Sequence, residues 1–136
     1  MTRTFKARKV VRGCAEGEAL MCPGSFSFLG DVDMQTGEII AAGNPCRGMR
    51  LAGRVLAYPE TKGSSGGCVV LITLARRGLA PAALITEKPA DYNLAEGAIL
   101  AAIPFVCEPE AGLFGSLATG KRVRVDADRG RVDLLD

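Results

Sequence analysis

The chain has 136 residues, which fits one domain, because folded domains usually span about 50–250 residues. Its 17 Lys and Arg residues against 15 Asp and Glu leave a net charge of only +2, which argues against general binding to nucleic-acid phosphates. The chain contains no His. This excludes His general bases, Ser-His-Asp and Cys-His nucleophile pairs, His-ligated metals and phosphohistidine carriers.

Five cysteines are spread along the chain without a C-x-x-C pair: Cys14, Cys22, Cys46, Cys68 and Cys107. This spacing argues against a zinc ribbon or a self-contained iron–sulfur site, so we expect this chain alone to bind no metal or cofactor. No apolar stretch reaches the roughly 18 residues of a membrane-spanning helix, and no signal-peptide pattern follows the basic N-terminus. We expect a soluble, cytoplasmic protein whose reduced cysteines mostly pack as small apolar residues.

The N-terminal part of the chain predicts short strands and turns. Residues 1–12 combine basic side chains with apolar ones and predict an edge strand that faces water. Residues 13–18 are punctuated by glycine, and we interpret Glu16 and Glu18 as part of a solvated turn. Residues 25–29 alternate polar and apolar side chains, which predicts a half-buried strand.

A turn-rich loop is expected over residues 30–37. Its Asp31, Asp33 and Thr36 lack the spacing of an EF-hand calcium loop, so we interpret them as residues of Asx and Thr turns. Residues 38–41 then predict a short strand.

The middle of the chain predicts a strand, a loop and a helix. Residues 51–58 are mostly apolar and precede Pro59, which favours a strand. The apolar residues of segment 68–77 are followed by two Arg and then Gly78, which is typical of a helix C-terminus. Ser64 or Ser65 is the expected N-cap of this helix.

The C-terminal part predicts more strands. Residues 82–86 and a part of 98–106 are buried strands, and residues 123–125 and 131–135 flank a turn and form a hairpin. The segment 115–121 (GSLATGK) has the spacing of a phosphate-binding loop, but Arg replaces its Ser or Thr and a strand follows in place of a helix. We reject nucleotide binding there. The chain as a whole predicts a compact, strand-rich α/β domain.

The strongest candidate site is the loop between the middle strand and its helix, Lys62-Gly63-Ser64-Ser65-Gly66-Gly67. Ligands of α/β folds bind where a strand ends and a helix begins. Glycines leave backbone N–H groups accessible, and these groups and the helix dipole favour an anion or a deprotonated hydroxyl. Lys62 adds a positive charge. The residues alone leave open the alternative that Ser64 is merely a helix cap in a Gly-Ser loop.

Five blocks in order resemble one family, the small subunit of aconitase X, which is the swivel-domain half of a hydro-lyase related to aconitase. The blocks are 13–20 (GCAEGEAL), 27–33 (SFLGDVD) with Thr36-Gly37, 53–59 (GRVLAYP), 62–65 (KGSS) and 77–85 (RGLAPAALI). They cover nearly the whole chain, so residues 1–136 are expected to form a single swivel domain. The resemblance implies a swivelling β/β/α domain that closes over a large subunit carrying an iron–sulfur cluster.

The resemblance also implies roles for the candidate loop. In this family the first Ser after Gly in a G-S-[ST] motif is the catalytic base, and Ser64 matches it. Its neighbours Lys62, Gly63, Ser65 and Gly66 are then the expected substrate-binding residues. Aconitase follows its two serines with an Arg that binds substrate carboxylate, whereas this chain has Gly66, so that role passes to Lys62 or to the large subunit.

Two substrates are known in the family, cis-3-hydroxy-L-proline and mevalonate 5-phosphate. Archaeal members that use the second favour G-K-G-S-T-V-G, and this chain departs from that pattern with TKGSSGG. We therefore expect cis-3-hydroxy-L-proline as the substrate and keep mevalonate 5-phosphate as the alternative. A hypothesis of another class is a non-catalytic binding or regulatory swivel module without a large partner.

Overall fold

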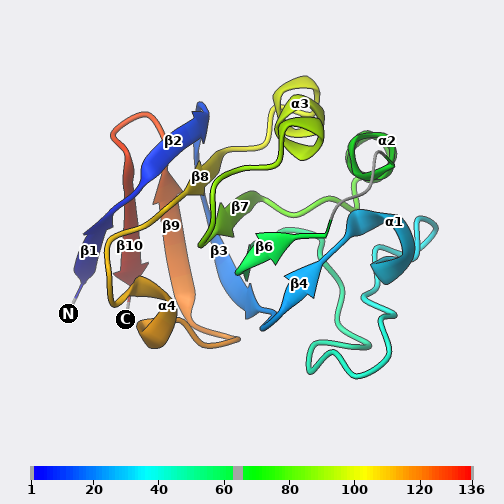
Figure 1. Ribbon diagram of the computed structural model, residues 1–136, viewed down its shortest axis with the longest axis horizontal. Helices are drawn as coiled ribbons and strands as arrows, with labels where there is room; N and C mark the ends of the chain where they lie inside the picture. The colour runs from blue at the N-terminus through cyan, green and yellow to red at the C-terminus, as the bar shows by residue number, and fades with distance from the viewer. Residues whose placement is uncertain (1, 63–65, 136) are drawn as a thin grey trace.

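The main sheet folds over on itself, so that consecutive strands form its two ends. In a computed structural model, which describes residues 2–62 and 66–135, the strand order is β1-β10-β9-β3-β5-β7-β8-β2. Only Ala7 separates β1 (Arg3–Lys6) from β2 (Arg8–Val11), yet these strands occupy opposite ends of the sheet (Figure 1). The edge strand predicted for residues 1–12 is thus present as two edge strands.

One half of the sheet is antiparallel. The strand β10 (Arg131–Leu135) pairs with β1 on one side and with β9 (Arg122–Asp126) on the other, and β9 pairs with β3 (Cys14–Met21). The C-terminal hairpin predicted from the sequence is confirmed. The turn predicted for residues 13–18 is wrong, because Cys14–Glu18 pair with β9 in register.

The other half of the sheet is mainly parallel. The end of β3 pairs with β5 (Val55–Tyr58), which is followed by β7 (Ala83–Thr86) and β8 (Phe105–Cys107). The strand β2 closes this half in antiparallel orientation. Every residue of β5, β7 and β8 is buried, as expected for parallel strands that are covered on both faces.

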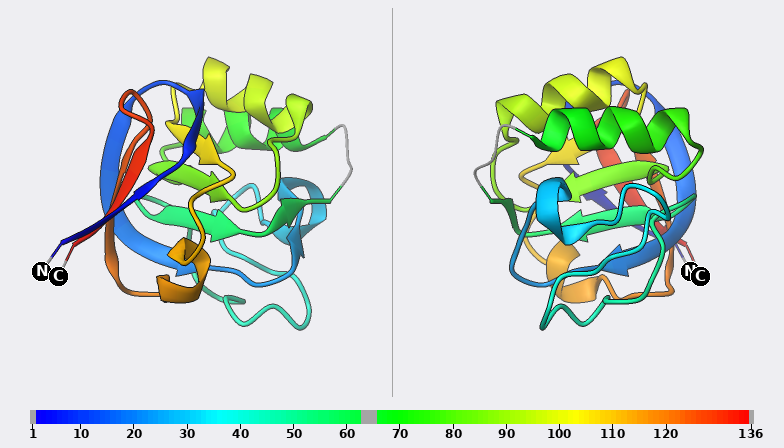
Figure 2. Two further views of the ribbon diagram at one scale, coloured as in Figure 1. Left: turned by 60° about the vertical axis from the view of Figure 1, so that its left-hand side comes forward. Right: turned by 90° about the vertical axis from the view of Figure 1, so that its right-hand side faces the viewer.

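Alternate residues of the parallel strands enter two different cores. Val55 and Ala57 pack between the two halves of the sheet, in one cluster with Val123 and Val125. Leu56 and its equivalents on the neighbouring strands pack toward helices α2 (Gly67–Arg76) and α3 (Tyr92–Leu100), which lie side by side over one face (Figure 2). Two sheet layers and a helix layer result, which confirms the predicted β/β/α fold class.

The predicted helix 68–77 is confirmed as α2, with both of its ends one residue earlier than predicted. Val70, Leu71 and Leu74 of α2 face the core, Arg77 is the C-cap, and Gly78 takes a φ of +71°. Helix α3 is an element that the sequence analysis missed. Among residues 2–62 and 66–135, no helix has both the length and the apolar character to cross a membrane.

The region before β5 differs most from the sequence-based expectation. The strand predicted at 25–29 is limited to β4 (Ser25–Phe26), which pairs with β6 (Glu60–Thr61), and a short turn of helix, α1 (Phe28–Asp31), follows it. Residues 38–41 form only isolated bridges, including Glu38 with Arg50. The predicted strand 51–58 begins at Val55, because a turn with Gly53 at a φ of +73° precedes it.

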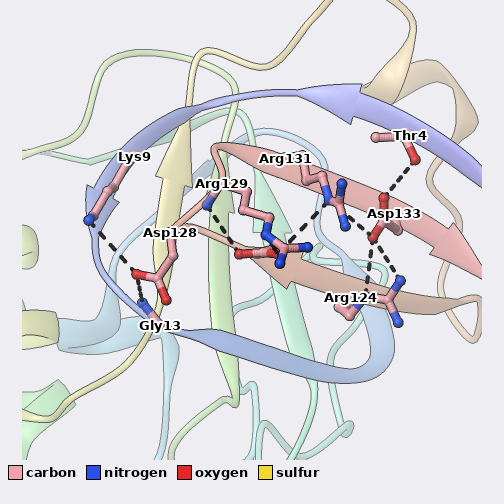
Figure 3. Close-up of polar contacts among 9 residues, drawn as sticks. Thr4, Lys9, Gly13, Arg124, Asp128, Arg129, Arg131 and Asp133 are labelled. Atoms are coloured by element: carbon pink, nitrogen blue, oxygen red, sulfur yellow. Dashed lines mark hydrogen bonds and ion pairs between the residues drawn. The ribbon is translucent and has the colours of Figure 1, made fainter.

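The outer surface of the antiparallel half carries a network of paired charges (Figure 3). The side chain of Asp133 is only 2% exposed and accepts hydrogen bonds from Thr4 Oγ1 at 2.7 Å and from Arg124 Nη2 at 2.9 Å. Arg131 Nε lies 3.7 Å from Asp133 and 3.9 Å from Asp126. Burial opposes ionisation of Asp133, but these hydrogen bonds and guanidinium charges outweigh it and lower its pKa. The network thus joins β1, β9 and β10 across their outer face.

Candidate functional site

The candidate loop lies where the parallel strands end and the helices begin. After β5 the chain forms β6 and reaches α2, and after β7 it runs through residues 87–91 into α3. The N-termini of the two helices are adjacent, since Asn93 Oδ1 accepts the backbone N–H of Cys68 at 2.9 Å. This edge of an α/β sheet is the usual location of a ligand site.

A buried aromatic cluster packs next to this edge of the sheet. The Phe26 ring centroid lies 5.1 Å from that of Tyr58 and 5.3 Å from that of Phe28, the latter edge to face. Tyr58, at the end of β5, is fully buried, and its hydroxyl is 3.0 Å from Thr61 Oγ1. Burial raises the pKa of Tyr58, which keeps the hydroxyl protonated and able to hold β6.

Lys62 is anchored at both its backbone and its side chain. Its N–H donates to Phe26 O at 2.9 Å, and its Nζ lies 3.0 Å from Asp31 Oδ2. The same Asp31 oxygen accepts the N–H of Ser27 at 2.9 Å. The predicted positive charge is therefore at the loop entrance, already paired with a carboxylate.

This pairing corrects the interpretation of Asp31 as an Asx-turn residue. Asp31 receives the N–H of Ser27, four residues earlier, and its side chain is only 13% exposed. Asp33 and Thr36 do form the predicted turns, with Asp33 Oδ1 accepting from Gln35 N at 2.8 Å and Thr36 Oγ1 from Glu38 N at 3.2 Å.

The N-terminus of α2 also differs from the prediction. Its N-cap is Gly66, not Ser64 or Ser65, and the side-chain acceptor at this helix end comes from Asn93 of α3. Helix α3 has the kind of cap expected for α2, since the Asp91 carboxylate accepts the N–H of Leu94. The cap of α2 was missed because its acceptor lies 25 residues later in the chain.

Of the predicted site residues, the structure describes Lys62 and Gly66, which flank the centre of the loop. Gly63, Ser64 and Ser65 lie outside the described residues. Two residues of the same edge that sequence reasoning did not assign are Asp31 and Asn93. The proximity of the 27–33 block to Lys62 is set by the β4–β6 pairing, which no local pattern indicates.

Other candidates from the sequence lie elsewhere. Glu16 is on a strand and pairs with Arg122 at 3.0 Å. The rejected phosphate-loop segment includes the end of α4 (Leu113–Ser116) and leads directly into β9, so no helix follows its lysine.

Three of the five thiols are buried, those of Cys22, Cys46 and Cys107, whereas Cys14 is exposed. Burial, together with a hydrogen bond to the neighbouring Cys46, raises the pKa of Cys22, which keeps it a neutral thiol. Within residues 2–62 and 66–135, no three Cys, Asp or Glu side chains converge as metal ligands.

Comparison with known proteins identifies the relatives of this chain. The family model described as "Aconitase X swivel domain" matches residues 4–134. The phosphomevalonate dehydratase small subunit of Thermococcus gammatolerans is 44% identical over 97% of this chain and 98% of its own length. The protein of the same name from Archaeoglobus fulgidus is 42% identical over the same shares. The crystal structure of holo-form aconitase X from Thermococcus kodakaraensis is 40% identical and superimposes with a TM-score of 0.91 over 98% of this chain and 99% of that one. These findings confirm the family resemblance.

Proposed function

Because the chain belongs to the aconitase X swivel domain family, we propose that it is the small subunit of a hydro-lyase that dehydrates mevalonate 5-phosphate. The observation that carries this proposal is the identity of 44% and 42%, over almost the full length, with two proteins named phosphomevalonate dehydratase small subunit. This reverses the order of the two substrates in the sequence analysis. Cis-3-hydroxy-L-proline was placed first because three residues of the candidate loop differ from the archaeal pattern. Similarity along the whole chain outweighs these three differences.

The partner is a large subunit that completes the active site. The names of the relatives describe them as small subunits, and the family resemblance implies a swivel domain that closes over a larger subunit. The family's iron–sulfur cluster does not fit the described part of this chain, where no three Cys, Asp or Glu side chains converge as ligands. We assign the cluster to the large subunit.

Ser64 is the proposed catalytic base of this subunit. It would accept the proton from the carbon next to the substrate carboxylate, and the substrate hydroxyl leaves from the adjacent carbon. The chain has no His, so a serine needs other stabilisation for its alkoxide. Support comes from the position of Ser64 between Lys62 and the N-terminus of the ten-residue helix α2, where backbone N–H groups and the helix dipole favour negative charge. Gly63, Ser65 and Gly66 complete the proposed substrate-binding loop.

The decisive experiment co-expresses the chain with its large subunit under anaerobic conditions and compares wild type with Ser64→Ala. We expect turnover of mevalonate 5-phosphate by the wild type and a loss of about 10²–10⁴-fold in kcat for the variant, because a general base contributes about that much. Size-exclusion chromatography should show an intact complex in both. Ser116→Ala, on α4 away from α2, is the matched control and should keep full activity (Figure 1).

Each other outcome contradicts one part of the proposal. An active Ser64→Ala complex would remove Ser64 as the base. Turnover of cis-3-hydroxy-L-proline in place of mevalonate 5-phosphate would restore the first substrate of the sequence analysis. A chain that binds no large subunit would favour the non-catalytic swivel module.

A further inference from the structure

A single turn contacts the chain on both sides of residues 63–65. This turn, residues 27–31, follows β4 and contains the short helix α1. It meets Lys62 through Asp31 and Gly66 through Leu29. The proposed catalytic segment therefore has its two flanks held by one element that comes from a distant part of the sequence.

The contact with Lys62 is an ion pair at a partly buried position. Lys62 Nζ lies 3.0 Å from Asp31 Oδ2, and the Asp31 side chain is 13% exposed. Salt screens such a pair less than it screens two exposed charges. The backbone N–H of Lys62 is bound as well, to Phe26 O at 2.9 Å, so both ends of this residue are fixed.

The contact with Gly66 is steric. A Cβ at this position would overlap Leu29 Cδ2 and lie 3.1 Å from Leu29 Cγ. The backbone of Gly66, with a φ of −87° and a ψ of −12°, is one that any residue adopts. A larger residue at position 66 would therefore require the Leu29 side chain to move, and the backbone conformation itself sets no such condition.

The turn itself is held by its own hydrogen bonds and by a buried aromatic ring. Ser27 Oγ donates to Leu29 O at 2.9 Å, and Asp31 N–H donates to Ser27 O at 3.2 Å. Gly30 supplies a φ of +99°, which interrupts the helix and returns Asp31 toward Ser27. Phe28 is 1% exposed and packs edge to face on Phe26.

We propose that the turn 27–31 is a clamp on the flanks of residues 63–65, and that Asp31, acting through Lys62, is a positioning residue of the hydro-lyase. The kinetic consequence rests on the proposed function, whereas the clamp itself does not. Lys62 already has a carboxylate partner within the chain. Its role is therefore to hold the loop, and the anionic groups of the substrate are bound by other residues.

The first test measures the clamp without any reaction. Backbone amide exchange of the full chain is followed by NMR for Asp31→Asn and for the control Glu16→Gln, which removes the 3.0 Å pair with Arg122 on a distant strand. Exchange at the Lys62 amide should accelerate about tenfold in Asp31→Asn, since local opening follows the loss of anchoring contacts, and should not change in the control. An unchanged Lys62 amide in Asp31→Asn would overturn the clamp.

The second test measures kinetics in the complex with the large subunit. Asp31→Asn and Lys62→Met should each lower kcat about 10- to 100-fold with KM within about twofold, because a small misplacement of a reacting group costs that much. The double variant should be no slower than either single one, because both changes break the same contact. If Lys62→Met alone raises KM and Asp31→Asn does not, Lys62 binds substrate and the positioning role is wrong.

The third test uses steric rescue at the other flank. Gly66→Ala should lower kcat about tenfold because its methyl group displaces Leu29. Leu29→Ala in the same chain should restore most of the activity. If Leu29→Ala does not restore activity, the contact between Leu29 and Gly66 is not part of the clamp. If the wild-type complex does not act on mevalonate 5-phosphate, the proposed function fails, and the amide exchange alone decides the clamp.

Discussion

Charge and packing serve different purposes at two opposite regions of the molecule. On the outer face of the antiparallel half, Asp133 is nearly inaccessible and is held by Thr4, Arg124 and Arg131 (Figure 3). At the helix N-termini, the Lys62–Asp31 pair borders exposed apolar side chains, including Leu29, which is 51% exposed. The first region pairs its charges within the chain. The second leaves apolar side chains exposed.

From this contrast we draw a general expectation. Substitutions in the antiparallel half should reduce the free energy of unfolding and leave the kcat of folded complexes unchanged. Substitutions at the helix N-termini should reduce kcat by more than their effect on stability explains.

The largest loss of stability is expected from Gly17→Ala in β3. A Cβ at this buried position would overlap the backbone carbonyl oxygen of Gly53, which cannot move aside as a side chain can. We expect a loss of about 3 kcal/mol in the free energy of unfolding, measured by urea denaturation. The control is Gly115→Ala, where the added methyl group meets nothing within 4 Å and should change stability little. Complexes that do form should keep wild-type kcat, and a lower kcat would contradict the division between the regions.

A smaller effect with a distinct pH dependence is expected from Asp133→Asn. The variant should lose about 2 kcal/mol at neutral pH, because hydrogen bonds to a buried carboxylate are weakened. The folded pKa of Asp133 is lowered from its ordinary 3.8, so the stabilisation is fully present above that pH and disappears as the pH falls through the folded value. Unfolding curves of wild type and variant should therefore converge in acid.

The control for Asp133 is Glu16→Gln on β3, which β9 separates from β10 in the sheet. Glu16 and Arg122 form a pair at 3.0 Å whose side chains are 39% and 53% exposed, so water competes for both charges. We expect a change below about 0.5 kcal/mol. A loss as large as that of Asp133→Asn would show that burial does not distinguish the two pairs.

The sequence predicted the elements whose signals are local. The end of α2 was indicated by two Arg before Gly78, and the β9–β10 hairpin by the turn between two apolar strands. Helix α3 was missed because the side of it that meets α2 is formed by Gly97, whose added Cβ would lie 3.0 Å from Cys68 Cα. The buried side of α3 consists of Leu94, Gly97 and Ala98, so its apolar stripe is short and includes a glycine, which weakens the helical pattern in the sequence.

The candidate loop was predicted, but its supports were not. Lys62 was located from its place between a strand and a helix, whereas its partner Asp31 is 31 residues earlier and was assigned to a local turn. The pairing depends on β4 lying beside β6, a two-residue contact set by tertiary packing. The order of the two candidate substrates changed for a related reason, because a few loop residues carry less information than the similarity of the whole chain.

A change in stability smaller than that of Asp133→Asn, accompanied by a kinetic effect, is expected from Asn93→Ala. Asn93 Oδ1 accepts the Cys68 N–H at the start of α2, and Asn44 Oδ1 accepts the Cys46 N–H at 2.8 Å in the loop between α1 and β5. Each alanine variant should lose about 1 kcal/mol, because each removes one side-chain acceptor from a backbone donor. Only Asn93→Ala should also lower kcat, several-fold, since the freed N–H lies at the N-terminus of α2, directly after the candidate loop in the sequence. Equal kcat in the two variants would mean that the N-terminus of α2 takes no part in the reaction, and the stabilisation proposed for the Ser64 alkoxide would have to come from the large subunit.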